Sequence, residues 1–367
     1  MNLRPMRTGL TGLALTLLCV TGLGVSSSVA QPMAATAAFT DSTAAGLGAT
    51  KRVAIASVIV SFQASVAALK EGGSGMFANK TSSSSVLAIT DFDLDRHDAI
   101  VAAAYQQLKA QLTAAGYEVV PETEIKASAA YAQILALSKI PTHTKFGNAL
   151  GDALLVSPAT LPGYLPYQGE TGIFSSPKSY IGWTGAFGSK SKTEGGPSAM
   201  TIGGNWKIPG LEVQMAKELN ANVVKAFYVV SIGEAGASRS RDFTGNENNW
   251  WNYSGQGSAS AALGLMADQT RIAFRTPNGN AKWQKVSMMK VVPAKDGDVV
   301  VRLAEPLQAG GHLFHLESSS REGGLFTPGA DFQFMFLATV TDPADYQRRV
   351  EALLNGANNA MVGLVKP

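Results

Sequence analysis

Cysteine is almost absent from this chain of 367 residues, which contains a single one, Cys19. Cys19 lies inside an apolar run and follows Leu17 and Leu18, whereas a lipidated cysteine needs a small residue directly before it. One cysteine cannot form an internal disulfide, and the chain beyond it offers neither a thiol nucleophile nor a cysteine ligand for a metal. We therefore expect a fold that is stabilised by its core alone.

Charged residues are also scarce. Lys, Arg, Asp and Glu make up 16% of the chain and the formal net charge is +3, whereas about a quarter of the residues of an average soluble domain are charged. A nucleic-acid-binding protein needs a basic stripe that neutralises phosphates, so the composition argues against a nucleic-acid partner. The apolar share of 46% is too high for a disordered chain and is sufficient for a sizeable core.

The first thirty residues have the pattern of a cleaved export signal. Arg4 and Arg7 precede the apolar stretch Leu10–Val25, and Ser28–Ala30 supplies the small residues that a signal peptidase requires. The stretch is shorter than the ~20 apolar residues that span a bilayer, so we expect cleavage and no transmembrane helix in the mature chain. Its 28 basic and 27 acidic residues then leave a charge of +1. The predicted location is the periplasm or the outer membrane, with the cell exterior as the alternative.

Two apolar runs predict the centre of a mixed sheet. Val53–Phe62 and Val223–Ile232 are almost continuously apolar and β-branched, as expected for strands covered on both faces. A helical pattern ending at Gly116 and a short strand at Tyr117–Val120 follow the first run, an order that is frequent in layered α/β domains. We therefore predict an α/β (α+β) fold in which helices flank a mixed sheet.

The C-terminal half predicts antiparallel β ribbons and a closing amphipathic helix. Asn278-Gly279 is a tight-turn signal between Thr270–Arg275 and Lys282–Val286, which we expect to pair as a hairpin. Asp331–Val340 alternates between apolar and other residues, and Asp342-Pro343 marks the start of the last helix.

The predicted organisation is a signal peptide at 1–30, a flexible linker at 31–50 and a single α/β domain at 51–367. Residues 157–200 interrupt this domain with eight glycines, five prolines and six aromatic residues. We interpret them as a Gly/Pro/aromatic-rich insertion, because an irregular connection of this length is unusual in a compact domain.

The order of elements resembles a known α/β domain. A strand at RVAIASVIVSF, a helix followed by AAGYEVV, a strand at ANVVKAFYVVSIGE, later ribbons and a closing helix are similar to the domain shared by curli-assembly secretion lipoproteins, TolB-like N-terminal domains and their periplasmic relatives. The likeness covers Lys51–Lys366, with 157–200 inserted. It implies an envelope accessory protein that acts by contacts, and no catalytic residue is carried over.

Two features depart from the curli-type members that form channels. Those proteins carry a lipidated cysteine and membrane-spanning hairpins, and Cys19 lacks the required context. Residues 258–276 are long enough for a ribbon, but Asp268, Arg271 and Arg275 favour a solvated face. The resemblance therefore implies a soluble protein instead of a pore.

An acidic run has part of the pattern of a calcium site. Asp91, Asp93 and Asp95 match the first three ligand positions of a helix-loop-helix calcium loop, but Arg96 stands where the sharp turn needs glycine. Helix capping explains these acids better, and we expect Asp95 or Asp98 to cap the helix that follows.

Histidines and serines give no catalytic pattern. His312 and His315 form H-x-x-H, but a spacing of three places them on opposite faces of a strand. Ser189 and Lys192 satisfy S-x-x-K only within a Gly-rich segment, and no G-x-S-x-G motif occurs. We expect no catalytic residues, no metal, no cofactor and no enzymatic activity.

The least ordinary segment is Asn246–Tyr253, with the sequence NENNWWNY. Trp250, Trp251 and Tyr253 offer flat apolar faces among amides, which suits a protein hot spot, sugar stacking or a membrane interface. The alternative is a loop whose tryptophans fold back over the ribbon. We predict a non-enzymatic envelope protein that binds another envelope or secreted protein through these residues. A glycan or small-ligand binder is the alternative function, a secreted hydrolase is the third, and oligomerisation is left open.

Overall fold

The structure is a computed structural model. It describes residues 37–39, 47, 50–72, 81–90, 93–138, 142–148, 151–164, 192–194, 207–243, 251–279, 283–287, 290–293, 298–303, 305–322 and 331–365. Residues 34–367 group into one compact unit. The predicted signal at 1–30 lies outside the described residues, as do most of the predicted linker and most of the predicted insertion.

The main sheet has eleven described strands, ordered β1-β14-β11-β9-β2-β7-β6-β8 with β5, β10 and β15 beside this path. The strands are β1 (Ala37–Phe39), β2 (Arg52–Gln63), β5 (Glu118–Val119), β6 (His143–Asn148), β7 (Gly151–Val156), β8 (Lys192–Glu194), β9 (Asn222–Phe243), β10 (Trp251–Leu265), β11 (Arg271–Arg275), β14 (Asp298–Leu303) and β15 (Leu307–Gln308). Parallel pairing of β2 with β9 at the centre confirms that the two apolar runs are core strands. The predicted α/β fold class is also confirmed, because helices flank this mixed sheet and the C-terminal half is rich in antiparallel strands.

A four-stranded sheet has the order β16-β17-β4-β3. Its strands are β3 (Ser65–Gly72), β4 (Thr81–Ile89), β16 (Phe314–Glu322) and β17 (Asp331–Val340). β17 and β4 pair in parallel, whereas the outer pairs β16–β17 and β3–β4 are antiparallel hairpins. The predicted strand Asp331–Val340 is confirmed.

The hairpin predicted around Asn278-Gly279 is wrong. β11 pairs with β9 on one side and with β14 on the other. Since both edges of β11 are occupied, no edge is left for the segment that follows the turn. That segment, β12 (Trp283–Ser287), pairs with β13 (Lys290–Pro293) instead.

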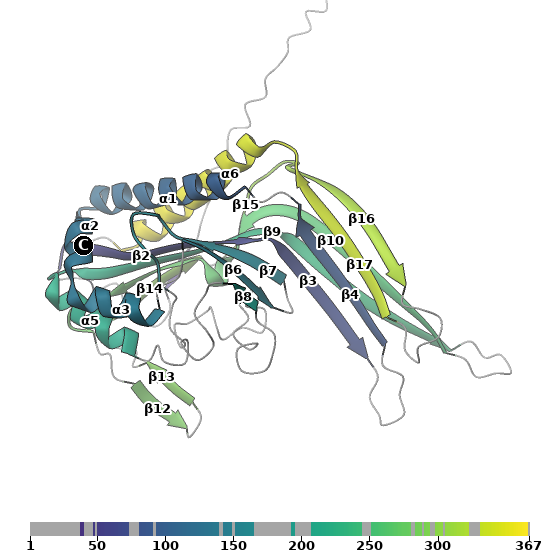
Figure 1. Cartoon of the computed structure of the whole chain (residues 1–367), viewed down its shortest axis with the longest axis horizontal. Helices are drawn as coiled ribbons and strands as arrows, with labels where there is room; N and C mark the ends of the chain where they lie inside the picture. Colours follow the sequence, from purple (N-terminus) through teal and green to yellow (C-terminus); the bar gives the residue numbers. More distant parts are fainter. Residues whose placement is uncertain are drawn as a thin grey trace, which may run out of the picture. The chain divides into compact units, whose positions relative to one another are not determined.

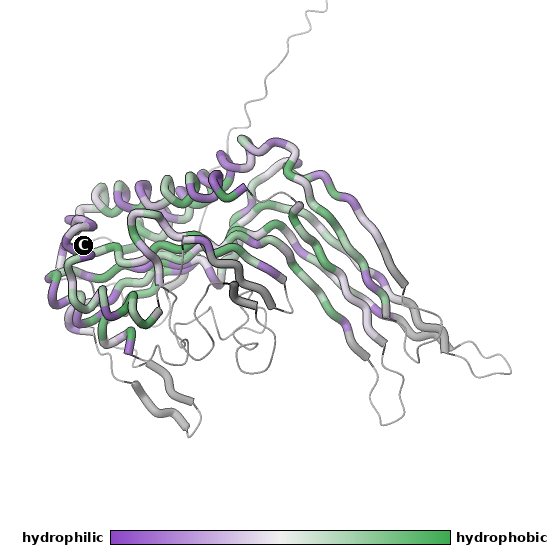
Figure 2. Tube along the Cα trace, in the orientation of Figure 1, coloured by the Kyte–Doolittle hydropathy of each residue, from purple (hydrophilic) through white to green (hydrophobic). Residues whose placement is uncertain are grey.

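Helices cover both faces of the main sheet. α1 (Leu94–Ala114) and α6 (Pro343–Gly363) lie side by side on one face, and α3 (Ala129–Ser138) and α5 (Ile208–Glu218) lie on the other, with the short α2 (Glu122–Ala127) at one end (Figure 1). Figure 2 shows that hydrophobic residues concentrate along the central strands between these layers. No helix of the described part of the chain is long and apolar enough to cross a membrane.

Asp93, and not Asp95 or Asp98, caps α1. Its carboxylate accepts the backbone N–H of Arg96, which has no carbonyl partner at the start of the helix. The acidic run therefore supplies the helix cap, but through Asp93, which lies two residues before Asp95 and five before Asp98.

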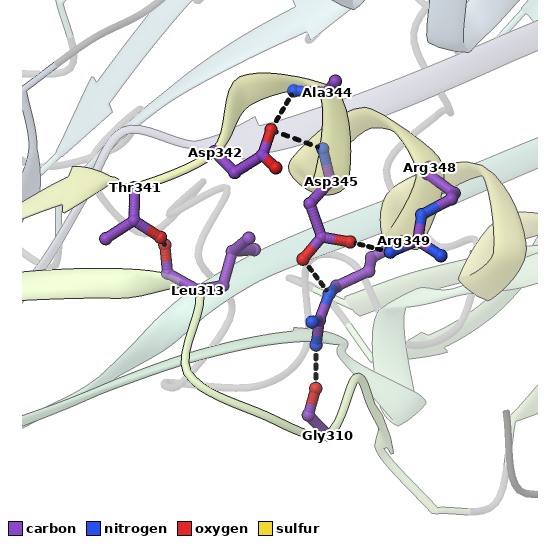
Figure 3. A network of polar contacts seen from close by, with 8 residues as sticks. All are labelled: Gly310, Leu313, Thr341, Asp342, Ala344, Asp345, Arg348 and Arg349. Atoms are coloured by element: carbon purple, nitrogen blue, oxygen red, sulfur yellow. Dashed lines mark hydrogen bonds and ion pairs between the residues drawn. The ribbon is translucent and has the colours of Figure 1, made fainter. Parts of the chain in front are cut away.

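The junction between β17 and α6 is held by a polar network (Figure 3). Asp342 caps the first turn of α6, as predicted, and Asp345 pairs with Arg348 and with Arg349, the latter at 2.7 Å. Arg349 also donates to the carbonyl oxygen of Gly310, between β15 and β16. Burial opposes ionisation of Asp345, but the hydrogen bonds from the two arginines outweigh it and hold its pKa below the usual value. The network thereby fixes α6 to the end of the four-stranded sheet.

β9 and β10 extend beyond the main sheet as a two-stranded ribbon. Pairing of β2 with β9 ends at Phe62 and Val230, whereas β9 continues to Phe243 in register with β10. We call residues 233–243 of β9 and 251–262 of β10 the β ribbon. It packs over β3, β4 and β17, so that the ribbon and the four-stranded sheet form two layers (Figure 1).

Small residues bring these two layers close together. A Cβ atom on Gly255 would lie 2.4 Å from the ring of Phe332, and one on Gly257 would lie 2.3 Å from that of Phe334. These glycines leave the space that the phenylalanine rings of β17 fill. The described serines of β4 complete the contact, because Ser85 donates from its hydroxyl to a carbonyl oxygen of β10 at 3.0 Å.

Candidate functional site

The structure places two of the three predicted binding residues at the start of β10. Trp251 is the cross-strand partner of Phe243, and Tyr253 is the partner of Arg241. Cross-strand partners, and residues two apart in one strand, share a face of a ribbon. Three aromatic positions, 243, 251 and 253, therefore share one face of the β ribbon, the face that Gly255 and Gly257 turn toward β17 further along the strand. Trp250 lies outside the described residues.

These positions lie at the far end of the β ribbon. Gly255 packs on Phe332, the second residue of β17, and Trp251 is four residues further toward the turn. β4 and β17 begin at this same end, because Asp331 pairs with Ser82. β3, β9 and β16 therefore end, and β4, β10 and β17 begin, at one end of the two layers (Figure 1). The alternative prediction, that the tryptophans fold back over the ribbon, concerns side chains that the structure does not describe.

A second cluster lies on the face of the main sheet that α5 covers. Glu212 of α5 is fully buried, with Lys225 of β9 at 2.8 Å and Arg275 of β11 at 3.4 Å from its oxygens. The hydroxyl of Tyr164 donates to the same carboxylate at 3.1 Å. Both oxygens of Glu212 are engaged, so the carboxylate neutralises charge that two strands bring into the core.

The expectation of a solvated face at residues 258–276 is wrong for the two arginines. Arg271 is 2% exposed and Arg275 is 3% exposed. Both belong to β11, a central strand that has neighbours on both edges, and this strand position buries them. The only sequence signal for this cluster was a charge within an apolar strand, such as Lys225 in VVKAFYVV.

A cavity of about 10 Å³ adjoins the cluster, enough for about one water-sized group. The described residues that line it are Ser57, Ile59, Tyr164, Lys225, Ala226, Phe227, Arg271 and Ala273. The ammonium of Lys225 lies 5.9 Å from the ring centre of Tyr164, and the guanidinium carbon of Arg271 lies 6.0 Å from that of Phe227. Two buried cations and two aromatic rings therefore surround one small space.

The histidines occupy separate places. His143 of β6 lies 2.6 Å from Asp98 of α1, and both side chains are partly exposed. His315 lies on β16 and His312 precedes that strand. The described residues contain no group of three or more His, Cys, Asp or Glu side chains with metal-binding geometry.

His97 is the most strongly perturbed of the histidines. It is 2% exposed, and its ring lies 4.3 Å from that of Phe62 and 6.1 Å from that of Tyr346. Its Nδ1 lies 2.5 Å from the carbonyl oxygen of Asp93, which makes Nδ1 the protonated nitrogen of the neutral ring. Burial, together with the positive charge of Arg96, lowers the pKa of His97 to about 4.

We expect this residue to make the protein acid-sensitive between pH 6.5 and pH 4. The unfolded chain gains a proton at His97 near pH 6.5 and the folded protein only near its lowered pKa of about 4, so stability is lost as pH falls through this range. The loss at pH 5, relative to pH 7, is about 2 kcal/mol. Urea unfolding of wild type and His97→Leu at both pH values measures it.

His315→Leu is the matched control, because the side chain of His315 is 67% exposed. The control should keep the full acid sensitivity, whereas His97→Leu should lose about 2 kcal/mol of it. Equal sensitivity in all three proteins would show that His97 is not the group responsible.

Comparison with known proteins finds no family model, no curated protein and no solved structure that matches this chain. The function has to be inferred from the residues themselves.

Proposed function

We propose that this chain is an exported, non-enzymatic envelope protein, an accessory or assembly factor that binds another envelope or secreted protein through the end of the β ribbon. The observation that carries the proposal is the register of β9 and β10, which places Phe243, Trp251 and Tyr253 on one face at that end. The signal pattern of residues 1–30 supports export. The order of elements, which resembles that of curli-assembly and TolB-like envelope domains, supports an accessory role.

The residue types at this end suit a protein interface. Tryptophan, tyrosine and arginine dominate binding hot spots, and Arg241 is the cross-strand partner of Tyr253. The ribbon that presents them is paired along its length, and regular backbone pairing lowers the conformational entropy lost on binding. The rest of the β ribbon, with its serines, glycines and alanines, offers few anchors of comparable size.

An affinity purification from cross-linked cells of the organism that encodes the protein tests the proposal. Tagged wild type should recover the same exported protein in repeated preparations. The double variant Trp251→Ala/Tyr253→Ala should recover it at least about tenfold less, because hot-spot residues contribute 2 kcal/mol or more each. Gln256→Ala is the matched control, since Gln256 lies exposed on the opposite face of the same strand.

Two results would contradict the proposal. Equal recovery of the partner by wild type and the double variant would remove the β ribbon end as the interface. A clean preparation without any protein partner would favour the alternative, a glycan or small-ligand binder. Quenching of tryptophan fluorescence by envelope polysaccharides, absent in the double variant, would then identify a glycan.

A further inference from the structure

We propose that residues 257–262 of β10, which we call the open edge, bind an extended segment of another protein as an added β strand. In the part of the chain that the structure describes, this stretch of β10 pairs only with β9. Strand addition combines backbone hydrogen bonds with contacts of alternate side chains. The open edge shares no residue with the aromatic positions at the end of the β ribbon, so this site and the proposed interface stand or fall separately.

The same side of β10 already carries a strand next to the open edge. Gly264 and Leu265 pair with β9 on one side and with β15 on the other. Ala309 continues this pairing, because its backbone N–H donates to the carbonyl oxygen of Leu263 at 2.9 Å. The chain then turns away at Gly311, which has φ +90°, and enters β16. β15 is therefore the start of a third strand of the ribbon layer, and no other described strand continues it along the open edge.

Partly exposed apolar side chains lie on the four-stranded sheet beside the open edge. β9 packs over β3 and β4, and β10 packs over β4 and β17 with less contact to β16, so the open edge points toward β16 (Figure 1). Leu316 of β16 is 37% exposed, although it pairs with the buried Ala338 and so shares the face that is turned toward the ribbon. A strand added at the open edge would cover this face. We call its partly exposed residues the apolar shelf: Phe314, Leu316, Phe334 and Phe336.

The residue types of β10 leave the open edge unprotected against pairing. β10 contains no charged residue and no proline from Trp251 to Leu265. Charged residues and prolines are the usual means by which proteins prevent strand addition at a sheet edge. The outer strands of the four-stranded sheet do carry charges, with Glu317 and Arg321 on β16 and Lys70 on β3. The open edge is therefore a better acceptor for an added strand than either edge of the four-stranded sheet.

The two faces of β10 determine the sequence pattern of the bound segment. Gly257 and Ala259 lie on the face turned toward the four-stranded sheet and are partly exposed, whereas Ser258 and Ser260 on the other face are exposed. An added strand continues both faces of the layer. Its residues toward the apolar shelf should be apolar and the alternate residues polar, and it should lack proline, which cannot donate a backbone hydrogen bond.

Selection of a phage-displayed library of random peptides on the purified mature chain tests this inference. The enriched peptides should alternate apolar and polar residues, and synthetic copies should bind saturably in fluorescence anisotropy. Methylation of one peptide nitrogen at a time should weaken binding about tenfold at every second position only, because alternate N–H groups of an added strand face β10. A library that yields no binding peptide, or binding without this alternation, would overturn the proposal.

A pair of glutamate variants connects the binding to the apolar shelf. Leu316→Glu should lower the affinity for the peptide at least about tenfold, because a charge replaces an apolar side chain that the added strand would bury. Ser319→Glu is the matched control and should bind like wild type, since Ser319 is exposed on the opposite face of β16. Wild-type affinity in a folded Leu316→Glu protein would overturn the proposal.

Circular dichroism shows whether the variants fold, and Leu316→Ala, judged by the same criterion, replaces Leu316→Glu if the charged variant does not. Trp251→Ala/Tyr253→Ala should bind the peptide like wild type, so a failure here is distinguishable from a failure at the end of the β ribbon. Sedimentation without peptide tests a second copy of the chain as the occupant. A dimer that Leu316→Glu dissociates would overturn the proposal in favour of self-association.

Discussion

Replacing Glu212 by alanine is expected to lower the free energy of unfolding by about 3–5 kcal/mol. Glu212 is fully buried and lies 2.8 Å from Lys225 and 3.4 Å from Arg275. The substitution leaves both cations in the core with one carboxylate fewer near them. When one partner of a buried ion pair is removed, the desolvation free energy of the remaining charge is no longer compensated. This cost is larger than the net contribution of the intact pair to stability. Urea unfolding followed by circular dichroism measures the change.

Two further variants make this result specific. Glu305→Ala removes an exposed carboxylate and should change stability by less than about 0.5 kcal/mol. Glu212→Leu combined with Lys225→Met replaces the shortest pair by apolar side chains and should be more stable than Glu212→Ala, because it leaves fewer buried charges. A Glu212→Ala protein as stable as Glu305→Ala would contradict the described cluster.

The second large effect is expected at Gly233, where alanine should lower stability by about 2–3 kcal/mol through the backbone conformation alone. Gly233 has φ +136°, a value that residues with a Cβ rarely adopt, and its added Cβ would lie 1.9 Å from the carbonyl oxygen of Ser260. The residue follows Val230, the last partner of β2 on β9, and so marks the place where the β ribbon leaves the main sheet. Thermal unfolding measures the loss.

Gly210 supplies a control of opposite sign. It lies in α5, and a Cβ added there would meet no atom within 4 Å. Alanine at this position should stabilise the protein by about 0.5–1 kcal/mol, because glycine is a poor helix former. A Gly233→Ala protein that unfolds at the wild-type temperature would contradict the described backbone conformation of Gly233 and its close approach to Ser260.

Local pattern was sufficient to predict the elements that form the core. The sequence predicts β2 as a buried strand because Val53–Phe62 is almost continuously apolar. In the structure every residue from Val53 to Gln63 is buried. The sequence predicts α6 as an amphipathic helix because its apolar residues recur at helical spacing after a capping residue, Asp342. In both cases the information lies within about twenty neighbouring residues.

The β ribbon could not be predicted in this way. The predicted strand ended at Ile232, whereas β9 continues through GEAGASRSRDF to Phe243. That segment has no apolar alternation, because small residues such as Ala235 and Ala237 lie on the face turned toward the four-stranded sheet, and at the paired glycines of β10 the bulk comes from Phe332 and Phe334 of a distant strand. The serines at the start of β4 (TSSSSVLAI) likewise show no apolar alternation. The contact that makes both segments strands is tertiary.

The candidate sites show the same division. The sequence indicated Trp250, Trp251 and Tyr253 as unusual, but only the pairing of β9 with β10 shows that positions 251 and 253 share a face with Phe243. The buried charges were placed in solvent, because the carboxylate that accompanies Arg275 comes from a helix more than sixty residues earlier. Nothing in the sequence indicates which acidic side chain pairs with which basic side chain over that separation.

Site-specific photo-cross-linking in cells tests the central claim most directly. A photoreactive amino acid is placed singly at position 251, at position 253 and, as the control, at position 256 on the opposite face of β10. If the end of the β ribbon binds an envelope or secreted protein, positions 251 and 253 should cross-link to the same exported protein and position 256 should not. Cross-linking of that protein from all three positions alike, or from none of them, would contradict the account.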